Sequence, residues 1–300
     1  MRVNKANYNN DNIGYYFILP ALVFMLVFIA YPVISNIILS FQDVNVMTIA
    51  SKVRAFTGFN NYRELLKGSI LRIAFINTFI FTICSLSIQF TIGFAFALLL
   101  NRNSRLVQRL RGIMMIAWMI PIAVTALLFK FMFSVNGGII NQILLGCHLV
   151  KAPVEWLLHP ASAMASIIMT NIWVAIPFNM ILISTGLTSI SAEIYESANL
   201  DGANAFQKFF QITLPLLKPS LEAVLILGFV NTFKVFDLVF VMTGGGPVNS
   251  THLLSTFSYD LSFVQFDFSK GAAVANILFA VLFVVGLGYV KLIKQEEEVM

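Results

Sequence analysis

The sequence predicts an all-α protein with six membrane-spanning helices. Of its 300 residues, 58% are hydrophobic and only 11% are charged, which lies outside the range of soluble domains. Long runs with very few charges recur along the chain, and each is long enough for the roughly 20 helical residues that cross a bilayer. We place the spans at residues 15–41, 73–100, 113–133, 163–187, 221–242 and 272–293.

The first apolar run is expected to remain in the protein as a membrane helix. It is too long for a signal peptide, and no small-residue cleavage site follows it. Pro20 and Pro32 lie within it, which predicts a frayed start and a kink near its end.

Basic residues give the orientation. The short loop NRNSRLVQRLR contains no acid but has four arginines, at Arg102, Arg105, Arg109 and Arg111, and such loops face the cytoplasm. With six spans, both termini and residues 189–219 are then cytoplasmic. Residues 42–72 would be external, although they hold Lys52, Arg54, Arg63, Lys67 and Arg72. The net charge of +5 is therefore attributed to topology, and no nucleic-acid partner is predicted.

The stretch YESANLDGANAFQKFFQITLPLLKP, residues 195–219, is too polar for a membrane span. Ser191 is a predicted N-cap, with Glu193 in the first helical turn. Helical spacing predicts one face of small residues plus an acid, formed by Ala198, Asp201, Gly202 and Ala205. A second, apolar side is expected to lie against the membrane helices and consists of Leu200, Ala203, Phe206 and Phe210. Pro215 and Pro219 are expected to end this helix.

The charge of this segment favours a protein partner over a lipid surface. Helices that lie on lipid headgroups carry a polar face rich in Lys and Arg. This one carries Glu193, Glu196 and Asp201. We therefore expect residues 189–219 to form a docking surface for a cytoplasmic protein, although composition alone fits a lipid-surface helix equally well.

Several motifs resemble one family of transporters. Glu196-Ser-Ala, then Asp201-Gly-Ala and Leu214-Pro-Leu-Leu-Lys-Pro, resembles the cytoplasmic EAA loop of binding-protein-dependent ABC importer permeases, with Ser197 in place of the first alanine. FKVFDLVFVMTGGGPVNST is similar to the Phe-Asp … Thr-Gly-Gly-Gly-Pro ending of carbohydrate permeases of the maltose and glycerol-phosphate type. LPALVFMLVFIAYPVISNIILSF and IPIAVTALLFKFMFSVNGGIIN resemble the first and third helices of that branch.

The resemblance implies a type I ABC importer permease fold in a bacterial or archaeal cytoplasmic (inner) membrane. It implies a transport subunit that is not an enzyme and forms half of a pathway for a sugar, with a glycerol-phosphate-like or other polar small solute as the alternative. The implied partners are a second permease subunit, two ATP-binding subunits that use ATP and Mg, and an external solute-binding protein. The positions implied to contact the ATPase are Glu196, Ala198, Asp201, Gly202 and Ala205.

These inferences divide the chain into three parts. Residues 1–72 hold the N-terminal helix and the external loop. Residues 73–293 form the permease core, which includes the cytoplasmic loop at 189–219. Residues 294–300 form a cytoplasmic tail.

No cofactor or metal is predicted for this chain. It has no GxxxxGK[ST] motif, and its histidines show no metal-ligand spacing. Gly244, Gly245 and Gly246 precede Pro247, which is typical of a turn and not of a phosphate loop. We assign these four residues a structural or gating role, together with Lys234 and Asp237, which at i, i+3 are expected to neutralise each other.

Candidate residues of the substrate pathway lie in the fourth and fifth spans. The resemblance at TGGGP points to Gly228, Thr232 and Val235, and in the fourth span to Ala175 and Phe178. Asn179 and Asn231 add amides that suit sugar hydroxyls. Packing around Pro177 explains each residue about as well. Because several of them are small or apolar, the second permease subunit is expected to hold most of the sugar contacts.

Two other classes of protein were considered. An intramembrane enzyme would need a convergent catalytic set, and Lys234 and Asp237 have no third member. A passive channel would explain six spans but would leave the docking loop without a role. The sequence therefore favours the importer permease.

Overall fold

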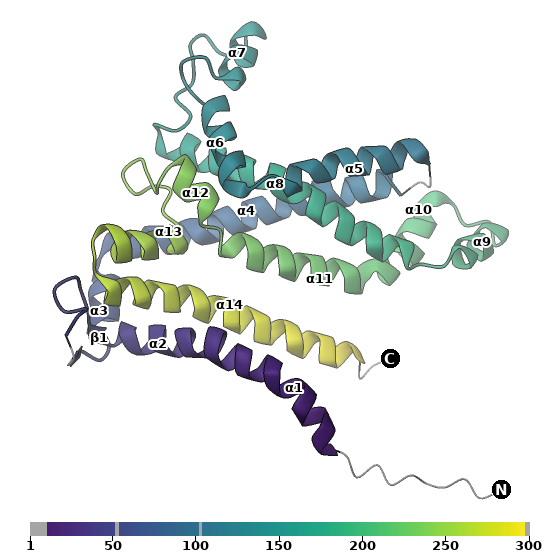
Figure 1. The fold of residues 1–300 in the computed structure, drawn as a ribbon. Coiled ribbons are helices and arrows are strands. Elements are labelled where there is room, and N and C mark those ends of the chain that lie inside the picture. Colours follow the sequence, from purple (N-terminus) through teal and green to yellow (C-terminus); the bar gives the residue numbers. More distant parts are fainter. Residues whose placement is uncertain (1–10, 52–53, 102–103, 298–300) are drawn as a thin grey trace, which may run out of the picture.

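The computed structural model describes residues 11–51, 54–101 and 104–297, and most of this part is helical (Figure 1). Two short strands pair antiparallel near the N-terminal third, with Gln42 opposite Phe56. The elements up to the middle of the chain are α1 (Asp11–Met25), η1 (Leu26–Ala30), α2 (Tyr31–Ser40), β1 (Gln42–Asp43), β2 (Ala55–Phe56), α3 (Asn60–Lys67), α4 (Ser69–Leu99), α5 (Arg105–Met119), α6 (Ile122–Met132) and α7 (Ile139–Gly146). The remaining elements are α8 (Pro160–Thr188), α9 (Ala192–Leu200), α10 (Ala205–Lys208), η2 (Phe209–Thr213), α11 (Leu214–Phe233), α12 (Asp237–Met242), α13 (Leu254–Tyr259), η3 (Asp260–Val264) and α14 (Phe268–Glu297).

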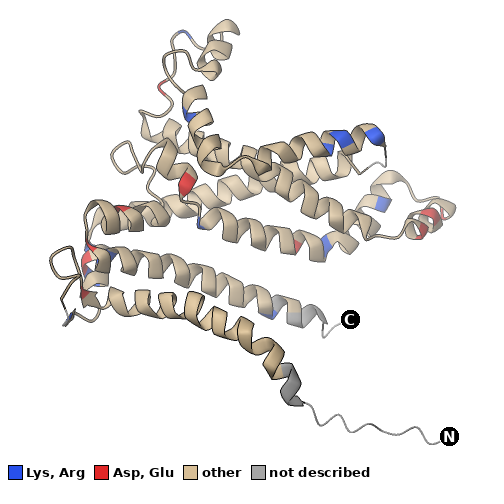
Figure 2. Cartoon of the chain, viewed as in Figure 1, with Lys and Arg blue, Asp and Glu red and all other residues tan. Residues whose placement is uncertain are grey.

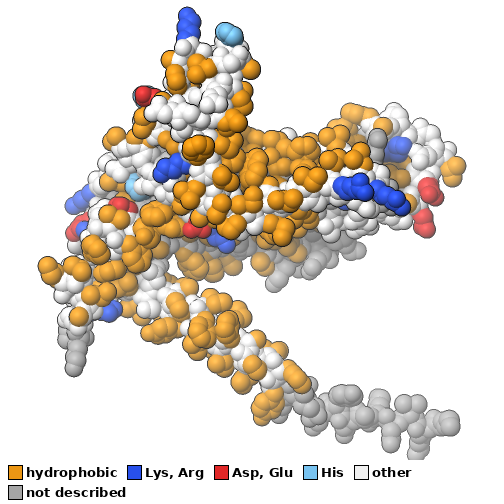
Figure 3. Space-filling view, turned by 45° about the horizontal axis from the view of Figure 1, so that its top comes forward, with side chains coloured by type: hydrophobic (Ala, Val, Ile, Leu, Met, Phe, Trp, Pro, Cys, Tyr) orange, Lys and Arg blue, Asp and Glu red, His pale blue; other side chains and the backbone are white. Residues whose placement is uncertain are grey.

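The number of spans agrees with the prediction. In the described part of the chain, five helical stretches are long and apolar enough to cross a membrane, and a bent helix pair raises the number to six. The first stretch, Tyr15–Ser40, has no buried residue in its most apolar window. Apolar side chains cover much of the visible surface of the bundle (Figure 3). This pattern is expected for a protein whose outer face contacts lipid.

The third span differs from the single helix predicted for residues 113–133. The structure has two helices there, α5 and α6, which are bent by 92° relative to each other. Pro121 lies at the break, and Ile120 before it is extended with ψ 132°. Proline has no N–H to donate and disfavours helical conformation in the residue before it. The third span is therefore a bent pair of helices and not one continuous helix, and Pro121 is the cause.

The fifth span also differs from its prediction at residues 221–242. The helix α11 ends at Phe233, and the separate helix α12 begins at Asp237 and packs against α6. At its start, the helical path runs unbroken from Ala205 to Phe233. The prediction that Pro215 and Pro219 end the helix is therefore wrong.

A π-helical turn lets the chain pass Pro215. In the turn η2, the N–H of Leu214 bonds the carbonyl of Phe209, five residues back. The same arrangement precedes Pro32, where the N–H of Tyr31 bonds the carbonyl of Leu26. In each turn the backbone hydrogen bonds span five residues and not four, directly before a proline, which has no N–H to donate. The helical path therefore continues through Pro215, where a break was predicted, and α1 and α2 meet at an angle near the π turn before Pro32 (Figure 1).

The core forms where α4 packs along α8, with α11 against both. Its three apolar clusters include Phe233 and Leu254 in one, Phe81 and Ile167 in another, and Met180 in the third. Gly93 lies where α4 meets α8, since a Cβ there would stand 2.7 Å from Cβ of Asn179. These contacts hold the helices that carry most of the candidate pathway residues.

The chain places its functional segments at two ends. The start of α5, the helix α9 and the far ends of α1 and α14 lie at one end, and the strands, α3 and α13 lie at the other (Figure 1). Arg105, Arg109 and Arg111 therefore share an end with residues 189–219, as the predicted orientation requires; Arg102 lies outside the described residues. In the predicted tail, α14 continues to Glu297, and residues 298–300 lie outside the described part.

Candidate functional site

The segment 189–219 forms a two-helix projection beyond the end of the bundle (Figure 1). Ser191 is the N-cap of α9, as predicted, and its Oγ accepts a hydrogen bond from the N–H of Glu193 at 3.3 Å. Tyr195 Oη lies 2.9 Å from Thr213 Oγ1 and ties α9 to the base of α11. Lys208 Nζ donates to Asn199 Oδ1 at 2.7 Å and ties α10 to α9. The projection is thus held as one unit.

Gly202 is the turning point of this unit. Its φ is +77°, in the left-handed region that favours glycine. The N–H of Ala203 bonds the carbonyl of Ala198 at 2.9 Å, and the N–H of Gly202 bonds that of Asn199 at 3.1 Å. This pair of bonds is the Schellman motif that ends many helices at a glycine. The predicted single face of Ala198, Asp201, Gly202 and Ala205 is therefore wrong, because α9 ends before Asp201 and α10 begins at Ala205.

The exposed surface of the projection mixes apolar and acidic side chains. Leu200 is 91% exposed and Phe206 is 71% exposed, so the prediction that they lie against the membrane helices is wrong. Glu193, Glu196 and Asp201 are exposed on the same unit (Figure 2). Ala198, by contrast, is buried against its own chain. Of the five positions implied to contact an ATPase, Ala198 is the one that faces inward, and Glu196, Asp201, Gly202 and Ala205 face outward.

A second candidate site is a polar cluster in the middle of the bundle. Gln89 on α4 donates from Nε2 to Thr232 Oγ1 on α11 at 3.3 Å. Its Oε1 accepts from Asn171 Nδ2 on α8 at 3.4 Å. Asn179, about two turns further along α8, is also buried, and its Oδ1 has no partner in the described structure. Four amide and hydroxyl side chains thus lie among apolar helices, where polar groups are costly unless they bond across helices.

The seven candidate pathway residues fall into two groups. Asn179, Gly228 and Thr232 lie inside the chain, in or beside this cluster. Gly228 lets α11 approach α4, since a Cβ there would stand 2.7 Å from Cδ1 of Leu86. The other four are partly or fully accessible on the helix surfaces and are Ala175, Phe178, Asn231 and Val235. Phe178 stacks on Trp118 at 5.7 Å between ring centroids.

A third candidate site is the loop after α12 that contains the three glycines. Gly244 has φ +59° and Gly245 has φ +90°. A Cβ on Gly245 would stand 2.3 Å from ring atoms of His252, so only glycine fits there. Asn77 on α4 anchors the loop, because its Nδ2 donates to the carbonyl of Ser250 at 2.8 Å and to that of His252 at 3.2 Å. The prediction that these glycines form a turn is confirmed, and hydrogen bonds from Asn77 attach the turn to α4.

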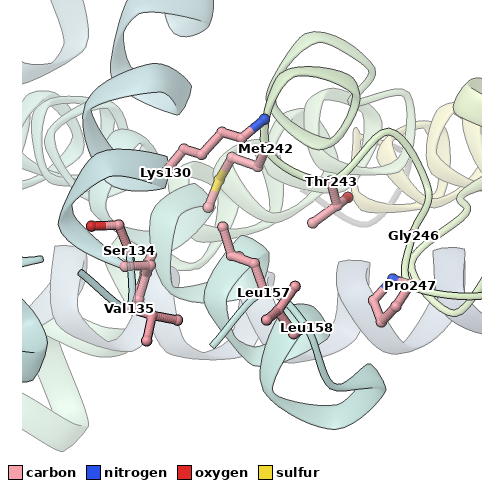
Figure 4. A pocket seen from close by; sticks show the side chains of 10 residues that line it. Lys130, Ser134, Val135, Leu157, Leu158, Met242, Thr243, Gly246 and Pro247 are labelled. Carbon is pink, nitrogen blue, oxygen red and sulfur yellow. The ribbon is translucent and has the colours of Figure 1, made fainter. Parts of the chain in front are cut away.

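A cavity of about 490 Å³ opens beside this loop. Figure 4 shows side chains from α6, α12 and the loop before α8 that converge on it. The lining is mostly apolar, with Leu157, Leu158 and Met242 among its residues, and Pro247 at one edge. Lys130 also lines it and donates from Nζ to the carbonyl of Val241 at 3.1 Å.

The predicted neutralisation between Lys234 and Asp237 does not form. Both side chains are exposed, and no ion pair joins them in the described structure. Lys234 is the C-cap of α11 and Asp237 opens α12. The i, i+3 argument requires a continuous helix, and the break at 234–236 removes it.

The comparisons with known proteins decide the family. Residues 89–295 match the sequence model of the binding-protein-dependent transport system inner membrane component. The chain belongs to this family. It is 34% identical over 288 residues to the trehalose/maltose transport system permease protein MalF of Thermococcus litoralis, with 96% of each chain covered. It is 29% identical to the diacetylchitobiose uptake system permease protein DasB of Streptomyces coelicolor, with 95% of this chain and 87% of that protein covered.

The fold agrees with this membership. A crystal structure of a bacterial ABC transporter involved in the import of the acidic polysaccharide alginate has a chain that superposes with a TM-score of 0.80 at 23% identity. That alignment covers 95% of this chain and 96% of the other. This inner membrane component is therefore a multi-pass membrane protein with the type I importer permease fold.

Sequence reasoning missed the residues that hold these sites together. Gln89 joins three helices, and it was visible as a lone amide in the apolar run of the second span. His252, one of the histidines without metal-ligand spacing, is only 5% exposed and supports the glycine loop. Burial lowers its pKa, although the charge of Asp260 opposes this shift. No local pattern pointed to His252, because its role depends on a packing contact with Gly245.

Proposed function

We propose that this permease forms half of the membrane pathway of an ATP-driven carbohydrate importer and couples to its ATPase through residues 189–219. The observation that carries the coupling is the exposed apolar surface on a rigid projection outside the bundle. Leu200 and Phe206 stay largely exposed in the described structure, although Phe206 contacts the ring of Phe210. Large apolar side chains exposed beside acids mark a surface that a partner protein covers.

The partner at this surface is a separate ATP-binding subunit. The chain lacks a phosphate-binding motif, so ATP and Mg are used by two partner subunits. The projection shares an end with Arg105, Arg109 and Arg111 (Figure 2), and a basic loop end is cytoplasmic. This arrangement supports our proposal that the ATPases are in the cytoplasm and the permease is in the cytoplasmic (inner) membrane of a bacterium or archaeon.

A second permease subunit completes the pathway. Transporter sites form where two repeats or halves meet, and this chain supplies one half. Ala175, Phe178, Asn231 and Val235 are accessible and are the residues we assign to that meeting surface. Asn179, Gly228 and Thr232 support it from behind. An external solute-binding protein delivers the cargo at the opposite end, where the glycine loop lies.

The cargo is a carbohydrate. Relatives named for trehalose or maltose, diacetylchitobiose and sulfoquinovosyl glycerol are 34%, 29% and 31% identical to this chain. Accessible Phe178 with Trp118 offers an apolar surface for sugar rings, and Asn231 offers an amide for hydroxyls. A phosphate-bearing or otherwise anionic solute is the second candidate, favoured by Lys234, which is exposed and forms no ion pair in the described structure.

Co-purification tests the coupling surface. We expect Leu200→Asp to lose the ATP-binding subunit when the tagged chain is purified from its native membrane, because a charge replaces a 91% exposed leucine that the partner would bury. Val248→Asp is the matched control, since Val248 is 90% exposed in the glycine loop at the other end. Mass spectrometry of the bound subunits measures the result. An ATPase retained equally by both variants would contradict the docking role.

A further inference from the structure

Residues 42–72 carry cations that the predicted topology leaves unexplained. The acid Glu64 in this segment is paired with a lysine from α14, because its Oε2 lies 3.1 Å from Nζ of Lys270. The same Nζ lies 3.1 Å from Oδ2 of Asp267. Arg63 and Arg72 are exposed, and neither forms an ion pair in the described part of the chain. This end of the molecule therefore presents positive charge that its own acids do not neutralise.

One of these arginines lies at the edge of an apolar hollow. The hollow measures about 510 Å³ and lies between α3, the start of α4 and α14, and its volume is within the range of about 300–1,000 Å³ that is typical of small-molecule sites. Its lining consists of Tyr62, Leu66, Leu71, Arg72, Phe75 and Ile277. Leu66 is 75% exposed and Phe75 is 38% exposed. The hollow is thus open to the outer surface of the bundle.

The hydroxyl of Tyr62 is occupied by hydrogen bonds within the protein and does not serve a ligand. Its hydroxyl donates to Ser40 Oγ at 2.8 Å and accepts from Asn276 Nδ2 at 3.3 Å. Asn276 Oδ1 in turn accepts from Asn36 Nδ2 at 2.7 Å. This chain of bonds joins α2, α3 and α14, so the walls of the hollow are held in place. Arg72 is then the lining residue that offers free polar donors.

This chemistry matches one class of ligand. A guanidinium binds phosphate oxygens through paired N–H donors, and an apolar hollow beside it accommodates an acyl chain. A sugar would need several polar groups around it, and this hollow offers one. We propose that the hollow binds an anionic phospholipid, with its phosphate on Arg72 and an acyl chain along Leu66 and Phe75. The lipid belongs to the leaflet opposite to residues 189–219 (Figure 1).

The proposal gives one basic residue of the external segment, Arg72, a specific role, and it does not depend on the transport function. Arg72 is the fourth residue of the membrane-crossing helix α4, and the ends of such helices are expected near the lipid headgroups. An arginine there would otherwise only extend to the interface. The adjoining hollow and the fixed Tyr62 distinguish a lipid site from that simpler arrangement.

Native mass spectrometry of the purified complex tests the proposal. The tagged chain, with the subunits that accompany it, is titrated in mixed micelles with phosphatidylglycerol or phosphatidylcholine. We expect Arg72→Gln to weaken phosphatidylglycerol binding about five-fold, the factor for one basic residue near an anionic surface. Arg63→Gln is the matched control, because it removes a charge on α3 that is also exposed but does not line the hollow. Leu66→Trp, which fills the hollow, should also weaken binding.

Four results would overturn the proposal. Equal phosphatidylglycerol binding by wild type and Arg72→Gln would remove the phosphate contact. Equal loss in Arg63→Gln would indicate a diffuse charge effect, and displacement of the lipid by free glycerol phosphate would indicate a soluble phosphate ligand. If Arg72→Gln weakened binding of the external solute-binding protein and left lipid binding unchanged, the site would be a protein contact. The unfolding midpoint of each variant confirms that it is folded.

Discussion

The two ends of this permease differ in how closely their glycines are packed: the projection is open, and the loop after α12 is tightly packed. Gly202, in the projection, and Gly245, in the loop after α12, both have positive φ, at +77° and +90°. A Cβ on Gly202 would meet no atom within 4 Å, whereas one on Gly245 would stand 2.3 Å from the ring of His252. Gly202 thus forms a turn with open space around it, whereas Gly245 packs tightly against a buried side chain.

The surroundings repeat this contrast. Around Gly202 the chain exposes Leu200 and Phe206 and is held by bonds within the projection. Around Gly245 the chain is tied to α4 by Asn77, and His252 is buried. One end is arranged to meet a partner, and the other is arranged to keep its shape. Substitutions at the two glycines should therefore fail for different reasons.

The largest effect is expected at the pinned end. Gly245→Ala places a side chain on a backbone with positive φ and brings it into a clash with His252. Together these effects should lower the free energy of unfolding by about 3 kcal/mol or more. We expect a lower unfolding midpoint and a reduced yield of the folded complex. Gly244→Ala is the control, because φ is +59° there but the nearest atom to a Cβ is 3.8 Å away. Equal losses in the two variants would show that the contact with His252 does not matter.

An intermediate effect is expected at the projecting end. Gly202→Ala should cost about 1 kcal/mol, since only the backbone conformation opposes it, and Gly202→Asn should cost less because Asn tolerates this conformation. Gly202→Trp should leave membrane insertion intact but abolish transport, because it adds bulk to the docking surface. Uptake assays together with membrane levels separate these outcomes. Normal transport by Gly202→Trp would count against docking at this turn.

Hydropathy was sufficient to predict the number of spans but not where their helices break, since a run of about 20 apolar residues has few alternatives to crossing the bilayer. Proline was a less reliable guide. Pro121 breaks a helix by 92°, but the helical path continues through Pro32 and Pro215 because a π turn precedes each. Whether a proline breaks a helix depends on how neighbouring helices pack, which cannot be read from the sequence.

The break between α11 and α12 shows the same limit more clearly. Residues 234–236 contain neither Gly nor Pro, so no local signal marks it. The hydroxyl of Ser255, from the start of α13, bonds the carbonyl of Val235, and α12 packs on α6. Tertiary contacts satisfy the freed backbone groups and make the break possible.

The candidate sites were predictable in part. Motif and charge located the projection, and the N-cap at Ser191 was confirmed. The continuous helical face was wrong because Gly202 was placed inside a helix, although a glycine in that setting also signals a helix end. Gln89 could have been found as an isolated amide in an apolar run. The support that His252 gives to Gly245 depends on a contact in space between residues whose side chains suggest no pairing.

The smallest effect is expected from the ion pair that fastens α3 at the pinned end. The hydrogen bond and the charge of Lys270 lower the pKa of Glu64 below its usual 4.5. A lowered carboxyl pKa contributes stability above about pH 4.5, and this contribution is lost as the pH falls through the folded-state pKa. The contribution is small, because Glu64 is exposed and Lys270 keeps Asp267 at 3.1 Å. We expect Glu64→Gln to lower the unfolding midpoint slightly at pH 7, with the difference from wild type decreasing below pH 4.5 and vanishing below the folded-state pKa. A difference that persisted at low pH would show that Glu64 acts through packing and not through its charge.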